Sequence, residues 1–252
     1  MDGTTTADGP PRRRTQRSWR SWRPVAMVQA AHPRLGLLSA LGLAGGAALS
    51  GRPTREVAMV LATAVVGQAV LGWHNDLVDR ERDTAHDRQD KPLAQGRLDP
   101  GSMWFWLAVG VLLVVPLAVF HGLWAAGAYL GALVLGLVGN VVLRRGMLSW
   151  LTWAASYALY PAFLAYGGWG GVGREAPPEV AMTFLAALLG VCVHVLAALP
   201  GLVADNEDGL RHLPLRLALR IGAPRLLWAT LVATALVLAA LLGTGARVGL
   251  TQ

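Results

Sequence analysis

The sequence predicts an all-α fold, a polytopic transmembrane helical bundle of about seven helices. Hydrophobic residues make up 54% of the 252 residues and charged residues only 15%, whereas soluble domains carry about 25% charged residues. Seven apolar runs approach or exceed the roughly 18 residues that mark a transmembrane helix. Basic residues gather in alternate connections between these runs, which is the pattern that membrane insertion produces.

The seven predicted spans follow one another along the chain with mostly short connections. They are residues 25–49, 57–73, 103–120, 123–143, 148–166, 180–200 and 226–243. The first span is interrupted near His32 and Arg34, two polar residues that are candidates to face a cavity. The alternative is a short first helix that begins at Arg34. Residues 1–24 are polar and basic, so we expect them to be disordered or to lie on the membrane surface. Residues 25–252 are expected to form one membrane domain.

The formal net charge is +7, but the positions of the charges argue against a nucleic-acid partner. Most basic residues precede the first predicted span or follow the second, fourth and sixth, and the other side receives Arg52, Arg55, Arg174 and Arg247. Because basic residues are retained in the cytoplasm, we expect a cytoplasmic N-terminus whose arginines contact anionic membrane lipids. The excess of arginine over a single lysine, Lys91, is typical of a GC-rich bacterial genome. The predicted location is therefore a bacterial cell membrane.

Ten of the fifteen acidic residues lie in or beside two short segments, 75–83 and 205–208, which follow the second and sixth predicted spans. Both segments therefore fall on the cytoplasmic side. On a helix, four oxygen-bearing side chains of the first segment share a face about 100° wide. They are Asn75, Asp76, Asp79 and Asp83, and we expect Glu81 and Arg82 to lie away from that face. Carboxylates so close together repel one another unless a hard cation binds them, and Mg²⁺ takes one or two carboxylates together with substrate phosphates. The alternative is a solvated acidic loop balanced by neighbouring arginines.

The second acidic segment is shorter. Asp205 and Asp208 stand three residues apart and so share a helix face, with Glu207 as an alternative to Asp208. Basic residues near both segments are candidates to bind phosphate oxygens that a metal leaves free, although the positive-inside rule alone also places basic residues here. These candidates are Arg88, Lys91, Arg97, Arg144 and Arg145.

The spacing of these residues resembles the UbiA superfamily of intramembrane prenyltransferases. That family shows Asn-Asp-x-x-Asp-x-x-x-Asp after its second helix, which residues 75–83 match in full, and then a basic-Pro-Leu-x-x-Gly segment, matched by residues 91–96. A basic pair after the fourth helix is also similar, as is the His212-Leu213-Pro214 stretch. The chain departs from the family in two ways. Gly209 stands where the second motif has its last Asp, and seven helices are expected rather than eight or nine. One wall of the cavity is therefore expected to be open or completed by another subunit.

The resemblance implies a Mg²⁺-dependent enzyme that transfers a polyprenyl group from its diphosphate to an aromatic or lipid acceptor. It implies six metal ligands, of which the five aspartates are also catalytic: Asn75, Asp76, Asp79, Asp83, Asp205 and Asp208. It also implies five substrate-binding residues: Arg88, Lys91, Arg144, Arg145 and His212. Within the same fold, a membrane terpene cyclase and a phosphoribosyltransferase acting on a polyprenyl phosphate are alternatives. A transporter or a noncatalytic lipid-binding protein is an alternative from another class.

Isolated polar residues and spaced glycines inside the predicted spans add two further expectations. Polar groups within a membrane usually face the bundle interior, so four of them either line a cavity or form hydrogen bonds between helices: Gln68, Asn140, Tyr157 and His194. Two pairs of glycines spaced four apart, beginning at Gly42 and Gly127, are expected to allow close helix packing.

Overall fold

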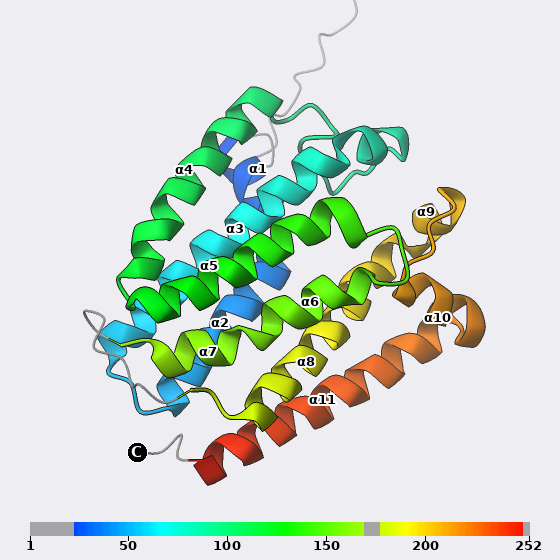
Figure 1. Cartoon of the computed structure of the whole chain (residues 1–252). Helices are drawn as coiled ribbons and strands as arrows, with labels where there is room; N and C mark the ends of the chain where they lie inside the picture. Colours follow the sequence, from blue (N-terminus) through cyan, green and yellow to red (C-terminus); the bar gives the residue numbers. More distant parts are fainter. Residues whose placement is uncertain (1–22, 169–176, 249–252) are drawn as a thin grey trace, which may run out of the picture.

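The computed structural model describes residues 23–168 and 177–248. All regular secondary structure in these two ranges is helical, and the long helices run side by side in one bundle, as Figure 1 shows. The predicted all-α fold is confirmed. The segment predicted to be disordered, residues 1–24, lies outside the described residues except for Arg23 and Pro24, which begin the first helix.

The order of the helices follows the order of the predicted spans. The helices are α1 Arg23–Ala30, α2 Pro33–Leu49, α3 Thr54–Ala85, α4 Pro100–Val119, α5 Leu123–Val138, the π-helix Gly139–Leu143, α6 Ser149–Ala158, α7 Tyr160–Tyr166, α8 Val180–Ala198, the 3₁₀ helix Leu199–Gly201, α9 Leu202–Glu207, α10 Leu213–Ile221 and α11 Ala223–Val248. Within the described ranges, five helical segments are long and apolar enough to cross a membrane: Thr54–Ala85, Pro100–Val119, Leu123–Leu143, Val180–Glu207 and Ala223–Arg247. The protein is therefore a multi-pass membrane protein.

The first and fifth predicted spans are each divided into two helices. His32 adopts a left-handed backbone with φ of 51°, and Pro33 then begins α2, so α1 and α2 are separate. Pro161 likewise stands at the start of α7, directly after α6 ends. Proline has no backbone N–H to donate to the preceding turn, so both divisions have a local cause in the sequence.

The longest helix, α3, carries the first acidic segment. The sequence predicted a span that ended at residue 73, but α3 continues for 32 residues from Thr54 to Ala85. At 1.5 Å per residue it is about 48 Å long, more than the roughly 30 Å of a bilayer core. Residues 75–83 therefore form the last turns of a continuous helix and not a loop, and this extension fixes their side chains on a rigid element.

Glycines on α3 allow two close approaches that hold this helix in place. A Cβ atom on Gly72 would lie 2.6 Å from the carbonyl carbon of Ala31, and one on Gly67 would lie 2.1 Å from the hydroxyl of Tyr129. The close packing predicted for the two glycine pairs that begin at Gly42 and Gly127 is wrong in part. Cβ atoms added to Gly42 and Gly127 would have no neighbour within 4 Å, so these two positions face open space.

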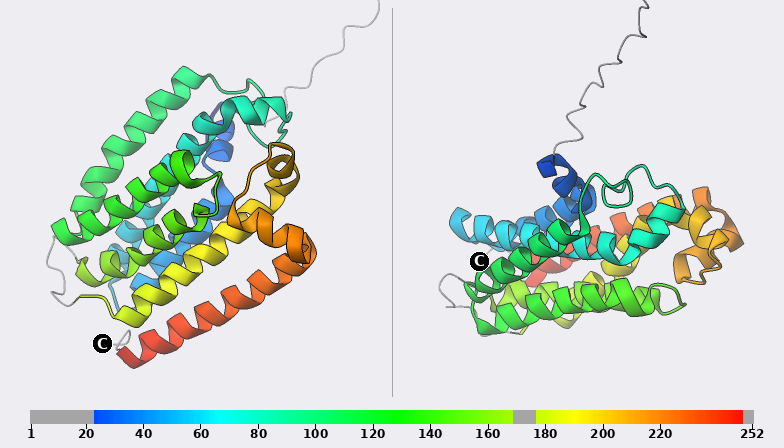
Figure 2. Two further views of the ribbon diagram at one scale, coloured as in Figure 1. Left: turned by 45° about the vertical axis from the view of Figure 1, so that its right-hand side comes forward. Right: turned by 90° about the horizontal axis from the view of Figure 1, so that it is seen from above.

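The bundle brings both acidic segments to one end. Helices α2 and α4 pack on α3, while α6 packs on α8 and α8 packs on α11. Figure 2 shows α9, α10 and the connection after α3 at the same end of the bundle. Two segments that lie more than a hundred residues apart in the sequence therefore meet in space.

Candidate active site

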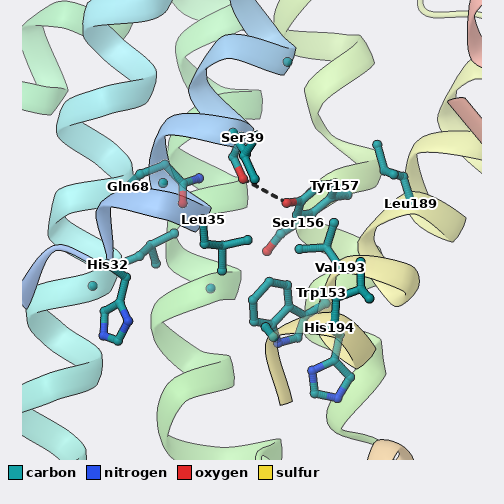
Figure 3. Close-up of a pocket in the computed structure, with 18 of the residues that line it drawn as sticks. His32, Leu35, Ser39, Gln68, Trp153, Ser156, Tyr157, Leu189, Val193 and His194 are labelled. Atoms are coloured by element: carbon teal, nitrogen blue, oxygen red, sulfur yellow. Dashed lines mark hydrogen bonds between the residues drawn. The ribbon is translucent and has the colours of Figure 1, made fainter. Parts of the chain in front are cut away.

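A cavity of about 2640 Å³ runs through the bundle between α2, α3, α6, α8 and α11. It extends from the acidic segments to Glu56 and Glu179 at the opposite end, and Figure 3 shows part of its lining. Ten of the eleven site residues expected from the sequence line it: Asn75, Asp79, Asp83, Arg88, Lys91, Arg144, Arg145, Asp205, Asp208 and His212. The eleventh, Asp76, is buried behind them with 1% of its surface exposed.

Asp76 is held between two basic side chains. Lys91 Nζ donates a 2.6 Å hydrogen bond to Asp76 Oδ1, and His32 Nε2 lies 2.8 Å from the same oxygen. The second oxygen, Asp76 Oδ2, is buried and has no hydrogen-bond partner among the described residues. A buried polar atom without a partner is destabilising, so Asp76 Oδ2 is a site where an additional ligand would stabilise the structure.

Lys91 connects the other members of the first segment. Its ammonium group lies 3.3 Å from Asn75 Oδ1 and 3.8 Å from Asp83 Oδ2, and only 8% of its surface is exposed. Asn75 in turn donates to Asp79 Oδ2 over 3.0 Å, and Arg144 forms an ion pair with Asp79. The expected grouping on one helix face is therefore present, with basic residues from two other segments beside it.

Asp205 of the second segment is buried and held by Arg82 and His212. Arg82 donates to Asp205 Oδ1 over 2.6 Å, and His212 Nε2 lies 2.9 Å from Asp205 Oδ2. The backbone N–H of Leu215 donates to His212 Nδ1 over 3.2 Å. Because Nδ1 accepts this bond, the hydrogen is assigned to Nε2, which then donates to Asp205.

Asp208 rather than Glu207 faces the first segment. Arg82 Nε donates to Asp208 Oδ2, and His86 lies 2.8 Å from its other oxygen. The hydrogen bonds from Arg82 and then His86 lower the pKa of Asp208. The carboxylate of Glu207 is 63% exposed and lies 3.7 Å from His86. The geometry therefore favours Asp208 as the partner of Asp205.

The shortened second motif has a structural cause. Gly209 stands in the position where the related family has an Asp, and its φ of 66° lies in the left-handed region. Glycine adopts this conformation without steric cost and commonly ends helices in this way. Gly209 therefore permits α9 to end here, whereas an aspartate in the same conformation would be strained.

Arg82 joins the two acidic segments, which the sequence analysis missed. The expectation that Arg82 lies away from the acidic face was wrong. Seven residues make almost two helical turns, so Arg82 lies only about 20° from Asn75 around the helix. The sequence spacing therefore predicts that Arg82 lies on the acidic face of α3. It does not identify the partner of Arg82, because Asp205 lies 123 residues further along the chain.

The donor set suits a hard divalent cation, although its carboxylates are paired with basic side chains. Within residues 23–168 and 177–248, no group of three or more His, Cys, Asp or Glu side chains is arranged to hold a metal. Asp76, Asp79 and Asp205 instead contact lysine, arginine or histidine. All six expected ligands offer oxygen atoms, which Mg²⁺ prefers, and Asp76 Oδ2 has a free position. The residues fit such an ion, provided that these ion pairs rearrange.

Two further basic candidates lie at the edge of the cavity. Arg88 donates two hydrogen bonds, of 2.9 and 2.8 Å, to Asp90. Arg145 is exposed, and its backbone carbonyl accepts a hydrogen bond from the Arg211 N–H. Both side chains line the cavity, and the Arg88 guanidinium also interacts electrostatically with Asp83 and Asp205.

The polar residues inside the helices fulfil both of their expected roles. Gln68, Asn140, Tyr157 and His194 all line the cavity. Each also contacts another helix, through Tyr160, the Leu71 carbonyl, Ser39 and Ser149 respectively. His32, weighed as a cavity residue, contacts Asp76 as described above, whereas the contact of His86 with Asp208 was not foreseen.

The fold is similar to solved structures of a UbiA homologue from Archaeoglobus fulgidus. The structure bound to GPP and Mg²⁺ aligns with a TM-score of 0.65 and 19% identity, covering 85% of this chain and 76% of the homologue. The structure bound to DMAPP and Mg²⁺ aligns with a TM-score of 0.64 and 20% identity, over 85% and 76% of the two chains. No curated protein matches the sequence significantly. Residues 36–251 match the UbiA prenyltransferase family, and the chain therefore belongs to that family.

Proposed function

We propose that the protein is a Mg²⁺-dependent intramembrane prenyltransferase that cleaves a prenyl diphosphate and passes the prenyl group to a hydrophobic acceptor. The observation that carries this proposal is the meeting of two acidic segments at one end of a long apolar cavity, joined by Arg82. Membership of the UbiA prenyltransferase family supports it. The related archaeal structures, described as bound to GPP or DMAPP with Mg²⁺, support the choice of donor and ion.

The acidic side chains would hold the ion on both sides of the cavity mouth. Asn75, Asp76, Asp79 and Asp83 would serve on α3, and Asp205 and Asp208 on the other side. Bound Mg²⁺ supplies positive charge that stabilises the departing diphosphate. Asp76 Oδ2, which lacks a partner within the described ranges, is the first ligand we assign.

Basic residues would then bind the diphosphate oxygens that remain free. Lys91 and Arg144 already lie among the carboxylates, and Arg88 lines the same cavity. Negative charge on the diphosphate grows as the allylic C–O bond breaks. Cationic side chains fixed around it therefore stabilise the transition state more than the bound substrate, which is the requirement for catalysis.

The apolar part of the cavity would shield the allylic cation from water. Trp153 lines the part of the cavity nearer the acidic segments, and the faces of aromatic rings attract cations. An acceptor with an electron-rich carbon, such as an aromatic ring or a lipid nucleophile, would form the new C–C or C–O bond and lose a proton. This route needs no covalent enzyme intermediate.

We place the acidic end of the bundle in the cytoplasm of a bacterium. Arg144, Arg211 and Arg216 lie near this end, whereas Arg52 and Arg55 lie at the opposite end of the bundle, before and at the start of α3. The excess of basic residues at the acidic end supports this orientation through the positive-inside rule.

A membrane terpene cyclase is the second candidate, and the shortened second motif favours it. Asp205 and Asp208 stand three residues apart, so the second carboxylate pair differs from the spacing of the related prenyltransferases. A cyclase would ionise the same donor and let its own double bonds capture the cation. Incubation of a prenyl diphosphate without any acceptor distinguishes the two reactions, because only a cyclase then releases a cyclic hydrocarbon.

The proposal is tested by diphosphate release in lipid nanodiscs supplied with geranyl diphosphate, Mg²⁺ and a pool of candidate acceptors. We expect Asp79→Asn and Asp205→Asn to reduce the rate at least 100-fold. Glu81→Gln is the matched control, because Glu81 is exposed on the same helix and does not line the cavity. Equal rates for Asp79→Asn and Glu81→Gln would contradict the proposal.

A further inference from the structure

A row of four side chains links α2 to α6, α7 and α3 across the cavity. Ser39 Oγ lies 3.1 Å from Tyr157 Oη, the rings of Tyr157 and Tyr160 are 5.1 Å apart, and Gln68 donates to Tyr160 Oη over 3.4 Å. All four residues line the cavity. We call this row, Ser39, Tyr157, Tyr160 and Gln68, the crossbar. Figure 3 shows its first hydrogen bond, with His32, Trp153 and His194 on one side of it.

The distance from the acidic segments to the crossbar can be estimated along the axes of α2 and α6. His32 contacts Asp76 directly, and Ser39 follows seven residues later on α2, which places it about 10 Å along the helix axis. On the facing side, Ser149 contacts His194 and the backbone of Leu213. Tyr157 follows Ser149 eight residues later on α6, or about 12 Å along that axis. Both ends of the Ser39–Tyr157 bond therefore lie at a similar depth.

This depth corresponds to a short isoprenoid tail. Three bonds of an extended chain span about 3.3–3.6 Å, so an isoprene unit of four chain bonds spans roughly 4.5–5 Å by the same geometry. With the diphosphate level with Asp79 and Asp83, which follow Asp76 towards the end of α3, the length from Asp76 to the crossbar is left for the tail and accommodates about two isoprene units. Leu35 and Val193 line this near half of the cavity beside Trp153.

The cavity continues beyond the crossbar. Gly42 follows Ser39 by three residues on the same side of α2 and also lines the cavity, and a Cβ atom there would have no neighbour within 4 Å. Gly45 behaves in the same way. The far half therefore has room for further isoprene units, and the Ser39–Tyr157 bond narrows the passage to it between α2 and α6.

We propose that the crossbar determines the length of the prenyl donor: tails of about two isoprene units end before it, and longer tails bind less well because the Ser39–Tyr157 bond narrows their path. This inference rests on the proposed function, since it names the donor class for the same site. Polar groups buried in an apolar cavity lose more than a hydrogen bond when separated, because each is then left without a partner. The crossbar therefore resists displacement by a hydrocarbon chain.

The test compares diphosphate release from geranyl, farnesyl and geranylgeranyl diphosphates by the full-length protein in nanodiscs. The wild-type kcat/KM is expected to fall at least tenfold from the ten-carbon to the twenty-carbon donor. Tyr157→Ala opens the far half and should raise the twenty-carbon to ten-carbon ratio at least tenfold. Ser39→Ala removes only the hydrogen bond and should raise this ratio about threefold, and it serves as the measurement if Tyr157→Ala does not fold.

A second substitution refills the opened space. Gly42→Leu in the Tyr157→Ala background should return the ratio towards wild type, because a leucine there occupies the far half. Gly127→Leu in the same background is the matched control, since Gly127 also has open space around it but does not line the cavity. Diphosphate release with the same donor profile in wild type, Ser39→Ala and Tyr157→Ala overturns the crossbar. Absence of release from every donor by the wild type overturns the proposed function, and the crossbar with it.

Discussion

Arg82 of α3 donates a 2.6 Å hydrogen bond to Asp205 of α9, a residue 123 positions further along the chain. The same guanidinium binds Asp208. One arginine therefore neutralises two carboxylates that would otherwise face the acidic end of α3 across the cavity. This arrangement holds the two acidic segments together while their side chains are not bound to a metal.

Replacing Arg82 should make the stability of the protein depend on Mg²⁺. In Arg82→Ala, Asp205 and Asp208 lose their shared cation, and breaking a buried pair costs about 3–5 kcal/mol. The Arg82 side chain is 27% exposed, so we expect the lower end of that range or somewhat less. Thermal unfolding in EDTA should shift to a lower temperature, and Mg²⁺ should restore much of the loss by neutralising the same carboxylates.

The control for this measurement is Arg80→Ala, because Arg80 is exposed on the same helix and does not line the cavity. Its unfolding temperature should change little in EDTA. An equal Mg²⁺ stabilisation of Arg80→Ala and Arg82→Ala would show that Arg82 does not substitute for the ion.

The part of the site that lies on one helix could be predicted from the sequence. Asn75, Asp79 and Asp83 share a face because helical periodicity acts locally, and it does so whatever the rest of the fold is. The breaks before Pro33 and Pro161 also follow from local chemistry, since proline cannot complete the hydrogen bonds of the preceding turn. What helical periodicity did not reveal was the length of α3, because residues 74–85 are polar and the apolar pattern ends before them.

Contacts between distant segments could not be predicted in this way. Ser39 and Tyr157 are separated by 118 residues, and His32 and Asp76 by 44. Periodicity places each residue on a face of its own helix, but the neighbour of that face depends on how the helices pack. The family resemblance supplied the pairing of the two acidic segments. It did not supply Arg82 or the crossbar.

His212 has two roles that substitutions can separate. Its Nδ1 accepts the Leu215 N–H at the start of α10, and its Nε2 contacts Asp205. Asparagine is a favoured residue at this capping position, and replacing a cap by alanine costs about 1 kcal/mol. We therefore expect His212→Asn to keep the stability of α10 but to release Asp205, and His212→Ala to lose both.

The measurement for His212 compares unfolding temperature with the Mg²⁺ concentration that gives half-maximal activity. Both variants should require more Mg²⁺ than the wild type, because Asp205 is no longer held in one orientation. His212→Ala should also unfold at a lower temperature than His212→Asn, because alanine cannot cap α10. If His212→Asn activates at the wild-type Mg²⁺ concentration, His212 serves only as a helix cap.

Lys91 should be essential for stability because it neutralises a buried carboxylate. Its ammonium group lies 2.6 Å from Asp76, and the two side chains are 10% and 1% exposed. Removing one partner of such a pair typically costs 3–5 kcal/mol, and removing both costs much less. Lys91→Met should therefore lower the unfolding temperature strongly, and Lys91→Met combined with Asp76→Asn should recover most of it.

The double variant should recover stability but not activity. Both the single and the double variant should release diphosphate at least 100-fold more slowly, because each lacks a proposed phosphate-binding group. A double variant as unstable as Lys91→Met would show that the charge of Asp76 is not the reason for the loss.

We predict that Asp90 limits the availability of Arg88 to a diphosphate, because it accepts two hydrogen bonds from the Arg88 guanidinium. Hydrogen bonds from Arg88 lower the pKa of Asp90 from 3.8 to about 2. The pKa in the folded protein is lower than in the unfolded chain, so the pair stabilises the fold above about pH 3.9. That contribution is lost as the pH falls through about 2. The Asp90 side chain is 63% exposed, so the contribution is about 1 kcal/mol or less.

Asp90→Asn should consequently leave the unfolding temperature nearly unchanged between pH 5 and pH 8 while it releases Arg88. If Arg88 binds the donor, its free guanidinium should lower the KM for the prenyl diphosphate about two- to fivefold, with kcat unchanged. Combining Asp90→Asn with Arg88→Ala should abolish this gain. A KM that stays at the wild-type value in Asp90→Asn would remove Arg88 from the diphosphate site and leave it with the role of a basic residue that fixes orientation in the membrane.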